Sequence, residues 1–476
     1  NYRSTQNIVL AANSLIEKNQ EQIRKEVFSE KDKGEPIGVF NAYSDVEEGE
    51  IIVNKIKQLH LREDYSYNDF AILYRTNAQS RIFEEALRKR GLPYKIYGGL
   101  SFYQRKEIKD VIAYFRLAVN PNDEEAFKRV INYPTRGIGD TTLNKIVGAA
   151  VLHETSLWKV LCEPLAYGLS INKGTHTKLQ GFRELIETFI KDAQEKDAYE
   201  VGSAIVRQSG IMNEIYQDRS PENLSRQENI EELVNGMHDF VATRQEEGNE
   251  HVALTDYLQE VSLLTDQDSD KEGDGEKITL MTIHSAKGLE FKNVFVVGLE
   301  ENLFPSPMSS DSVRGLEEER RLFYVAITRA EEHCYLSFAK SRFRFGKTEL
   351  SSPSRFLKDI DVRFLSIPQG EHVAQRVDEG ASRFRQQMAS SFVPKAAYPS
   401  RSMNEEHTRP SAQSQVSRFA GSRSAMQTPP PSQGARVLKK VSSISPSRPA
   451  LSPEASSGLQ VGAVIEHERF GIGDVG

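Results

Sequence analysis

The stretch that decides the fold is Ile278-Thr-Leu-Met-Thr-Ile-His-Ser-Ala-Lys-Gly-Leu-Glu-Phe-Lys-Asn-Val-Phe-Val-Val-Gly-Leu299. The apolar runs at its two ends, 278–283 and 294–299, have the length and the β-branched content of buried strands. A polar loop with His284, Ser285, Lys287 and Gly288 connects them. Ligand sites of α/β sheets lie at the carboxyl ends of strands, so this loop is a candidate site, although an ordinary connection also fits the pattern.

Strand and helix patterns alternate on both sides of this stretch. The sequence predicts further strands at 37–43, 70–74, 94–97 and 334–338, and helices at 8–15, 47–61 and 80–89. From about 104 to 275 the apolar spacing is helical throughout, with helices expected at 205–215, 229–243 and 254–264. This order predicts an α/β fold, in which a parallel sheet is interrupted by an all-helical insertion.

Composition narrows the possible functions. The chain has 476 residues and a net charge of -7, so its total charge does not indicate a nucleic-acid partner. No apolar run approaches the roughly 18 residues of a membrane span, which argues against an integral membrane protein. The two cysteines, Cys162 and Cys334, are too few for a disulfide framework or a zinc cluster.

The C-terminal part of the chain has a different composition. Residues 366–457 are basic and rich in Ser and Pro, which predicts a disordered linker that serves as a tether or contacts nucleic acid electrostatically. Residues 458–476 resemble the first strands of a small β-barrel. The chain begins without a methionine and ends within this pattern, so we expect it to be an internal part of a longer protein.

A second informative segment is Glu317-Glu-Glu-Arg-Arg-Leu-Phe-Tyr-Val-Ala-Ile-Thr-Arg-Ala330. Three glutamates at the start of a helix suit the positive end of its dipole. Surface ion pairs with Arg320 and Arg321 are an equally simple interpretation of these charges. Arg329 is different, because it ends an apolar helix just before a core strand. An arginine in that position predicts an anionic ligand such as a polyphosphate.

Together these segments resemble the fifth and sixth motifs of superfamily 1 helicases of the UvrD/PcrA/Rep type. Other motifs of that family are similar to Asn1-Tyr-Arg-Ser, Tyr74-Arg-Thr-Asn-Ala-Gln-Ser-Arg, Gly98-Gly-Leu-Ser-Phe-Tyr-Gln-Arg-Lys-Glu-Ile-Lys-Asp and Arg136-Gly-Ile-Gly-Asp-Thr-Thr-Leu. The resemblance covers about residues 1–365. The Gly-rich pattern at 458–476 is similar to the start of a Tudor-like or SH3-like domain.

The resemblance implies a domain layout. Residues 1–103 and 276–365 would form the second RecA-like motor domain, and 104–275 would be its helical inserted domain. The sequence has no phosphate-binding P-loop: its nearest match, Gly346-Lys347-Thr348, has Ser341 where the motif needs glycine. The P-loop and the Mg²⁺ ligands are therefore expected in an N-terminal half, and no metal site is expected in this chain.

The resemblance also implies residue roles at an ATP site. Tyr2 would stack on the adenine and Arg3 would reach the γ-phosphate. Glu290 would hold the ribose, and Arg329 would be an arginine finger that stabilises the transition state.

DNA contacts follow from the same resemblance. Single-stranded DNA would contact Asn77, Arg81, His284 and Phe345, whose aromatic and polar groups hold bases without reading their sequence. Phe345 also fits a half-buried core position. The Gly-Ile-Gly motif before a helix would contact duplex phosphates through its backbone, with Asp140 as the helix N-cap. The residues expected there are Gly137, Ile138, Gly139 and Thr142.

The function implied is that of the C-terminal half of an ATP-dependent 3′–5′ DNA helicase that acts in repair or replication. Its partners would be single-stranded DNA and junctions of single and double strands, with RNA polymerase or repair proteins bound by the tail. It would work in the bacterial cytoplasm, at the nucleoid. Two alternatives stay open at this point: a RecB/AddA-like helicase–nuclease subunit, and a non-catalytic DNA-binding or adaptor module.

Overall fold

The computed structural model describes residues 3–21, 27–218, 220–269, 275–344 and 346–367, and two short strands near the C-terminus. These strands, β9 (Val464–His467) and β10 (Gly471–Asp474), pair antiparallel. Strands were expected here, whereas the barrel they would begin remains a prediction. The predicted linker at 366–457 lies outside the described residues, apart from its first two positions.

An eight-stranded sheet forms the centre of the α/β part, in the order β3-β4-β2-β5-β6-β1-β8 with β7 paired to β6. All pairs are parallel except β6 with β7. The strands are β1 (Ile37–Ser44), β2 (Phe70–Tyr74), β3 (Tyr94–Ile96), β4 (Ile278–Thr282), β5 (Phe291–Val296), β6 (Ala330–Arg344), β7 (Lys347–Leu350) and β8 (Leu365–Ser366). The predicted parallel sheet is thus confirmed.

Helices cover both faces of this sheet. They are α1 (Gln6–Ile16), α2 (Asp45–Glu63), α3 (Ser80–Lys89), α13 (Pro307–Ser310), α14 (Val313–Ile327) and α15 (Phe356–Asp359). Successive side chains of a strand point to opposite faces. Accordingly Leu73 packs in the core beneath α1, α14 and α15, and its neighbour Ile72 packs beneath α2 and α3. Both faces are apolar, which is why the strands appear in the sequence as continuous hydrophobic runs.

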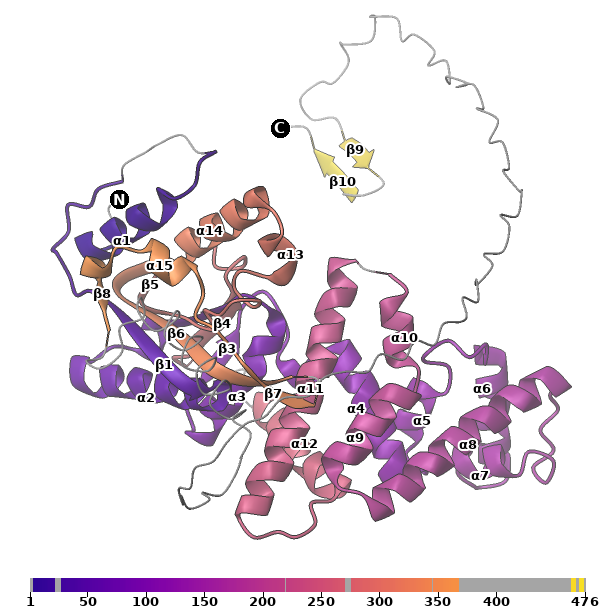
Figure 1. Ribbon diagram of the computed structural model, residues 1–476. Helices are drawn as coiled ribbons and strands as arrows, with labels where there is room; N and C mark the ends of the chain where they lie inside the picture. Colours follow the sequence, from indigo (N-terminus) through magenta and orange to yellow (C-terminus); the bar gives the residue numbers. More distant parts are fainter. Residues whose placement is uncertain are drawn as a thin grey trace, which may run out of the picture. The chain divides into compact units, whose positions relative to one another are not determined.

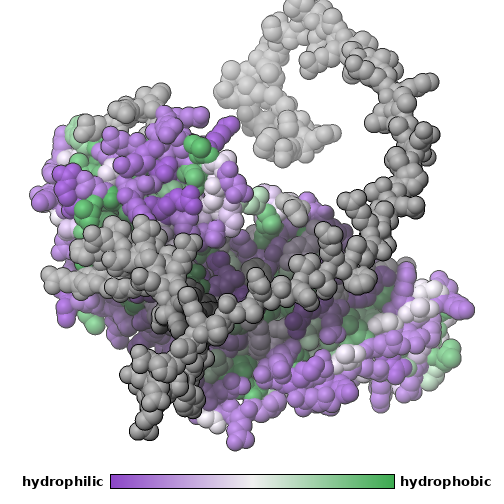
Figure 2. Space-filling model, in the orientation of Figure 1, coloured by the Kyte–Doolittle hydropathy of each residue, from purple (hydrophilic) through white to green (hydrophobic). Residues whose placement is uncertain are grey.

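The insertion between β3 and β4 is helical, as expected, and lies beside the sheet-bearing part (Figure 1). Its helices are α4 (Lys106–Val119), α5 (Glu124–Val130), α6 (Asp140–Leu152), α7 (Leu157–Cys162), α8 (Lys173–Glu195), α9 (Ala198–Gln208), α10 (Ile211–Tyr216), α11 (Pro221–Glu246) and α12 (Leu254–Ser269). They share a separate apolar core. Hydrophilic residues cover most of the visible outer surface of this region (Figure 2).

Two local expectations were wrong. The helix expected over 205–215 is split into α9 and α10, because Gly210 has a φ of 88°, a backbone conformation that a helix cannot continue through. Asp140 is not the N-cap of α6, since Gly139 holds that position and Asp140 is the first helical residue. The rejection of a P-loop at 346–348 agrees with the structure, where this segment turns from β6 into the antiparallel strand β7.

Candidate functional site

Arg329 lies between the end of α14 and the start of β6, and it is 9% exposed. Its guanidinium donates to the backbone oxygens of Val325 and Leu289, both at 3.1 Å, and to the hydroxyl of Thr328 at 3.3 Å. These contacts fix the direction of the side chain. They involve neutral acceptors only, so the positive charge remains available to an anion.

Arg3 and Glu290 form an ion pair beside Arg329, and each is about one-third exposed. Burial lowers the pKa of Arg329, the charge of Arg3 lowers it further, and Glu290 acts in the opposite direction. The guanidinium groups of Arg3 and Arg329 therefore lie near each other in a partly desolvated site. An anion bound to both would relieve their repulsion, which makes this a candidate site for a phosphate group.

The structure thus brings together three of the four residues expected at the ATP site: Arg3, Glu290 and Arg329. Tyr2 lies outside the described residues. The cluster is at the amino-terminal ends of the strands, because Glu290 directly precedes β5 and Arg329 directly precedes β6.

The opposite edge of the sheet holds two of the four residues expected to contact single-stranded DNA, Asn77 and His284. The neighbouring parallel strands β3, β4 and β2 end together there. Asn77 lies in a 3₁₀ turn shortly after β2 and is half-buried, and His284 follows β4 and is exposed. Gly98, after β3, has a φ of 71° and lies directly against Ser285 of the His284 loop. Phe345 lies outside the described residues.

The loop over 283–290 joins the two edges. Strands β4 and β5 are both parallel to β2, which lies between them. The loop therefore starts at the carboxyl-terminal edge of the sheet, near His284, and ends at the amino-terminal edge with Glu290. A displacement at one edge therefore has a short covalent path to the other. This connection was the part of the sequence singled out as a candidate site.

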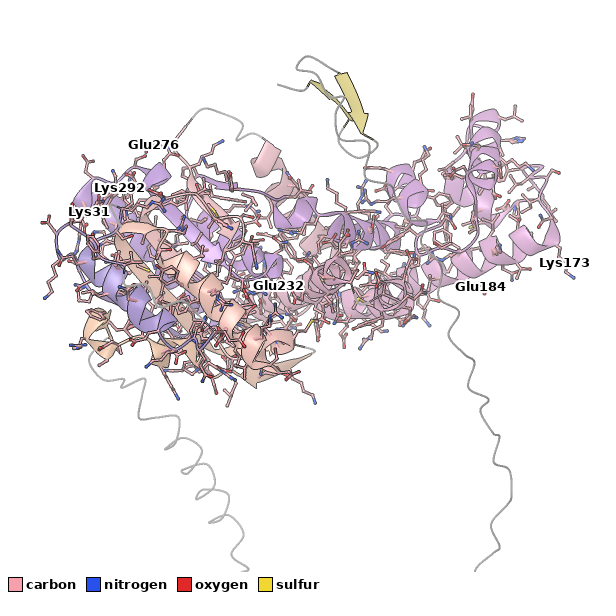
Figure 3. The ribbon with its side chains drawn as sticks, turned by 90° about the horizontal axis from the view of Figure 1, so that it is seen from above. Lys31, Lys173, Glu184, Glu232, Glu276 and Lys292 are labelled. Carbon is pink, nitrogen blue, oxygen red and sulfur yellow. The ribbon has the colours of Figure 1, made fainter. Side chains whose placement is uncertain are left out.

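Arg81 has a different role from the one expected. Its side chain is 2% exposed and pairs with Glu232 at 2.7 Å, Glu85 at 2.9 Å and Asp239 at 3.2 Å. Glu232 and Asp239 belong to α11 of the insertion, so Arg81 fastens the insertion to α3. Figure 3 shows Glu232 where the two parts of the chain meet. The predicted DNA contact is corrected, because a buried guanidinium with three carboxylate partners cannot reach a DNA strand.

Sequence reasoning did not identify the partner of Glu319. The glutamates at 317–319 lie in the second turn of α14, which begins at Val313 after the N-cap Ser312, rather than at its start. Arg321 and Glu318 form the expected exposed pair at 2.6 Å. Glu319, however, is 5% exposed and contacts Arg75, 244 residues earlier in the chain, at 2.7 Å. The only signal in the sequence was the position of Arg75, directly after a buried strand and two residues before Asn77.

The Gly-Ile-Gly motif forms a tight turn ahead of α6. Gly137 has a φ of 69°, which favours glycine, and the side-chain oxygen of Asn132 accepts from the backbone N–H of Ile138 at 2.9 Å. The side chain of Ile138 is 2% exposed and packs in the core of the insertion, so it is not available to DNA. Gly139 caps α6 without a side-chain hydrogen bond, and Thr142 is half-buried in the first turn.

The arginines near this turn are engaged within the protein. Arg129 pairs with Asp110 at 2.7 Å, and Arg136 donates to the hydroxyl of Tyr114 at 2.6 Å and to backbone oxygens. A cation that contacts the motif directly is Lys178 of α8, whose ammonium donates to the backbone oxygen of Gly137 at 3.1 Å. Neither its position nor its contact was apparent from the sequence.

Comparisons with known proteins identify the family. The model of the UvrD-like helicase C-terminal domain matches residues 1–341, and the chain belongs to this family. It is 40% identical to the ATP-dependent DNA helicase PcrA of Leuconostoc citreum over 77% of this chain and 49% of that protein. It is 39% identical to DNA helicase II of Escherichia coli over 76% of this chain and 49% of that protein.

A similar comparison holds for the PcrA helicase of Staphylococcus aureus, with 40% identity over 77% of this chain and 49% of the relative. The chain therefore spans about half the length of the curated relatives it matches. Within the described part of the chain, every helix is too short or too polar to cross a lipid bilayer.

Proposed function

We propose that this chain is the C-terminal half of an ATP-dependent DNA helicase that moves 3′ to 5′ along single-stranded DNA. The observation that carries the proposal is the placement of two different sites on one sheet. Arg3, Glu290 and Arg329 lie at the amino-terminal edge, and Asn77 and His284 lie at the carboxyl-terminal edge. The relatives named above are helicases by their names, which supports the same activity here.

ATP is the proposed nucleotide, with Tyr2 on the adenine, Glu290 on the ribose, and Arg3 and Arg329 on the γ-phosphate. The two neighbouring guanidinium groups fit a polyphosphate, because the single carboxylate of Glu290 balances only one of their two positive charges. We place the P-loop and the Mg²⁺ ligands in an N-terminal motor domain. When the two domains close on ATP, Arg329 would stabilise the charge of the transferring phosphoryl group, an effect worth about 10³–10⁵ in rate.

DNA is proposed to bind at two separate places. Asn77, His284 and Phe345 would hold the single strand in the motor domain, where stacking on each base is worth about 1–3 kcal/mol. Duplex DNA would contact the insertion at Gly137, Ile138, Gly139 and Thr142, through backbone groups in the case of Ile138. Hydrolysis would release the γ-phosphate contact and reopen the motor, so that it advances along the strand.

The wider setting is part of the proposal. Unwinding of this kind serves DNA repair and replication, so we place the protein in the bacterial cytoplasm at the nucleoid. The basic segment after residue 366 would tether further partners, such as RNA polymerase or repair proteins.

Strand separation by the complete protein, meaning this chain joined to its N-terminal half, tests the proposal. A duplex with a 3′ single-stranded tail should be unwound in the presence of ATP and Mg²⁺, whereas a duplex with a 5′ tail should remain intact. The 476-residue chain alone should bind single-stranded DNA without hydrolysing ATP. DNA binding by the complete protein without any ATP hydrolysis would support an adaptor module and overturn the helicase.

A further inference from the structure

The ion pair between Arg75 and Glu319 connects the carboxyl-terminal edge of the sheet, where DNA is proposed to bind, to helix α14. The Nη2 group of Arg75 donates to Glu319 Oε1 at 2.7 Å and its Nε group donates to Oε2 at 3.1 Å. Such a bidentate contact fixes the relative orientation of both side chains as well as their distance. The carboxylate of Glu319 is almost completely buried, so solvent screens the pair weakly.

Glu319 is held from a second direction as well. The backbone N–H of Ser306 donates to its Oε2 at 3.3 Å, and the hydroxyl of Ser309 donates to its Oε1 at 3.4 Å. The carboxylate therefore has donors on both sides, from the end of β2 and from the segment before α14. If Arg75 moves, the side chain of Glu319 is therefore not released, because Ser306 and Ser309 still donate to it.

Helix α14 can transmit such a shift because it is rigidly packed. Phe323, Ala326 and Ile327 are fully buried, and the ring of Phe323 packs against those of Phe304 and Phe356. Close-packed protein interiors resist compression and therefore transmit strain. From Glu319 to Ile327 the helix extends about 12 Å, at 1.5 Å per residue. It ends immediately before Thr328 and Arg329.

His284 lies close enough to feel both members of the pair. Partial desolvation lowers the pKa of His284, the positive charge of Arg75 lowers it further, and the negative charge of Glu319 raises it. The proposed base-stacking residue and the Arg75–Glu319 pair therefore share one electrostatic environment. A DNA phosphate arriving beside His284 would be attracted to the positive charge of Arg75 and would compete with Glu319 for it.

We propose that Glu319 is a positioning residue that couples DNA at this edge to the placement of Arg329 at the other. The inference rests on the proposed function, since it needs DNA beside His284 and ATP beside Arg329. DNA weakens the Arg75–Glu319 contact, α14 shifts as a unit, and Arg329 moves with its end. Glu319 touches neither DNA nor ATP in this scheme and acts through Arg75 and through α14.

The test uses the complete protein and measures ATP turnover as a function of oligo(dT) concentration. In Glu319→Gln, stimulation of turnover by saturating oligo(dT) should fall at least tenfold, while the half-stimulating concentration changes less than threefold. Glu318→Gln is the matched control, because Glu318 lies on the same helix and its ion pair with Arg321 is exposed. It should retain the stimulation of the unaltered protein.

Each other outcome has a distinct meaning. A higher half-stimulating concentration with full stimulation at saturation would show that Glu319 only shapes the DNA site and would overturn the coupling. Unchanged behaviour of Glu319→Gln would overturn it too. Should that variant fail to fold, Arg75→Lys provides the test. Lysine keeps the positive charge but cannot make the bidentate contact, so the same loss of stimulation is expected. Absence of stimulation in the unaltered protein would instead refute the proposed function.

Discussion

The guanidinium of Arg81 and the carboxylate of Glu232 meet at 2.7 Å although 151 residues separate them in the chain. Arg81 belongs to α3 beside the sheet and Glu232 to α11 of the insertion, so this contact crosses the boundary between the two parts. In contrast, Lys173 of α8 lies at the far end of the insertion, and Glu184 of the same helix lies between it and Glu232 (Figure 3). The attachment of the insertion thus depends on a residue whose sequence motif suggested a DNA contact.

Removing Arg81 should destabilise the fold rather than weaken DNA binding. Arg81→Ala leaves Glu232 and Asp239 with an uncompensated negative charge, which should lower the free energy of unfolding by about 3–5 kcal/mol. Urea-induced unfolding of the 476-residue chain, followed by circular dichroism, measures this. Arg90→Ala is the control, because Arg90 forms an exposed pair with Glu50 and should cost less than about 1 kcal/mol. A large loss of oligonucleotide affinity by folded Arg81→Ala would restore Arg81 as a DNA contact.

Arg329→Ala should abolish turnover and leave ATP binding in place. In the complete protein we expect kcat to fall by about 10³ or more, because an arginine finger acts mainly on the transition state. Steady-state hydrolysis and fluorescent-nucleotide binding distinguish the two effects. Arg321→Ala is a suitable control on the same helix, since Arg321 is partly exposed, forms ion pairs with the neighbouring Glu317 and Glu318 and donates to the backbone oxygen of Glu21. Near-normal turnover of Arg329→Ala would mean that this arginine is purely structural.

Duplex binding should depend on Gly139. A β-carbon there would meet no atom within 4 Å, so Gly139→Val keeps the fold but obstructs a phosphate approaching the start of α6. We expect about tenfold weaker binding to a tailed duplex, with a shallower salt dependence, and little change for single strands. Gly148→Val is the matched control in the same helix, because that position is equally open.

Gly137 is less informative for this purpose. Its φ of 69° and the closeness of Lys178 mean that a side chain there would strain the turn itself. Equal losses of single-strand and duplex binding by folded Gly139→Val would contradict a duplex-specific contact.

His284 should give DNA binding a characteristic pH dependence. In the free protein, partial desolvation and the charge of Arg75 lower the pKa of His284 from its ordinary value. DNA favours the protonated ring, so affinity should increase as the pH falls and level off only below the pKa of the free protein. In titrations of the 476-residue chain with oligo(dT) at low salt, the rise should therefore continue to a lower pH than an unperturbed histidine would give. His284→Asn should remove this component, and identical profiles for both proteins would assign it to other groups.

The layers of the fold were predictable from local patterns. Strands such as β2 and helices such as α3 were predicted with the bounds that the structure shows, because a strand buried on both faces must be continuously apolar and a covering helix must repeat at its own period. The insertion was apparent for the same reason. Arg3, Glu290 and Arg329 were identified through motifs, and the structure places them together.

What the local pattern could not reveal was which charged side chains are buried. Arg81 was expected to contact DNA and Arg75 had no expected role, yet each contacts a carboxylate brought to it by a distant element. Charge is costly to bury, so its position depends on whether a partner is present, and that partner is supplied only when the chain has folded. The periodicity of apolar residues is a property of neighbours in the chain and determined the layers. The pairing of buried charges is a property of neighbours in space, and only the tertiary structure decided it.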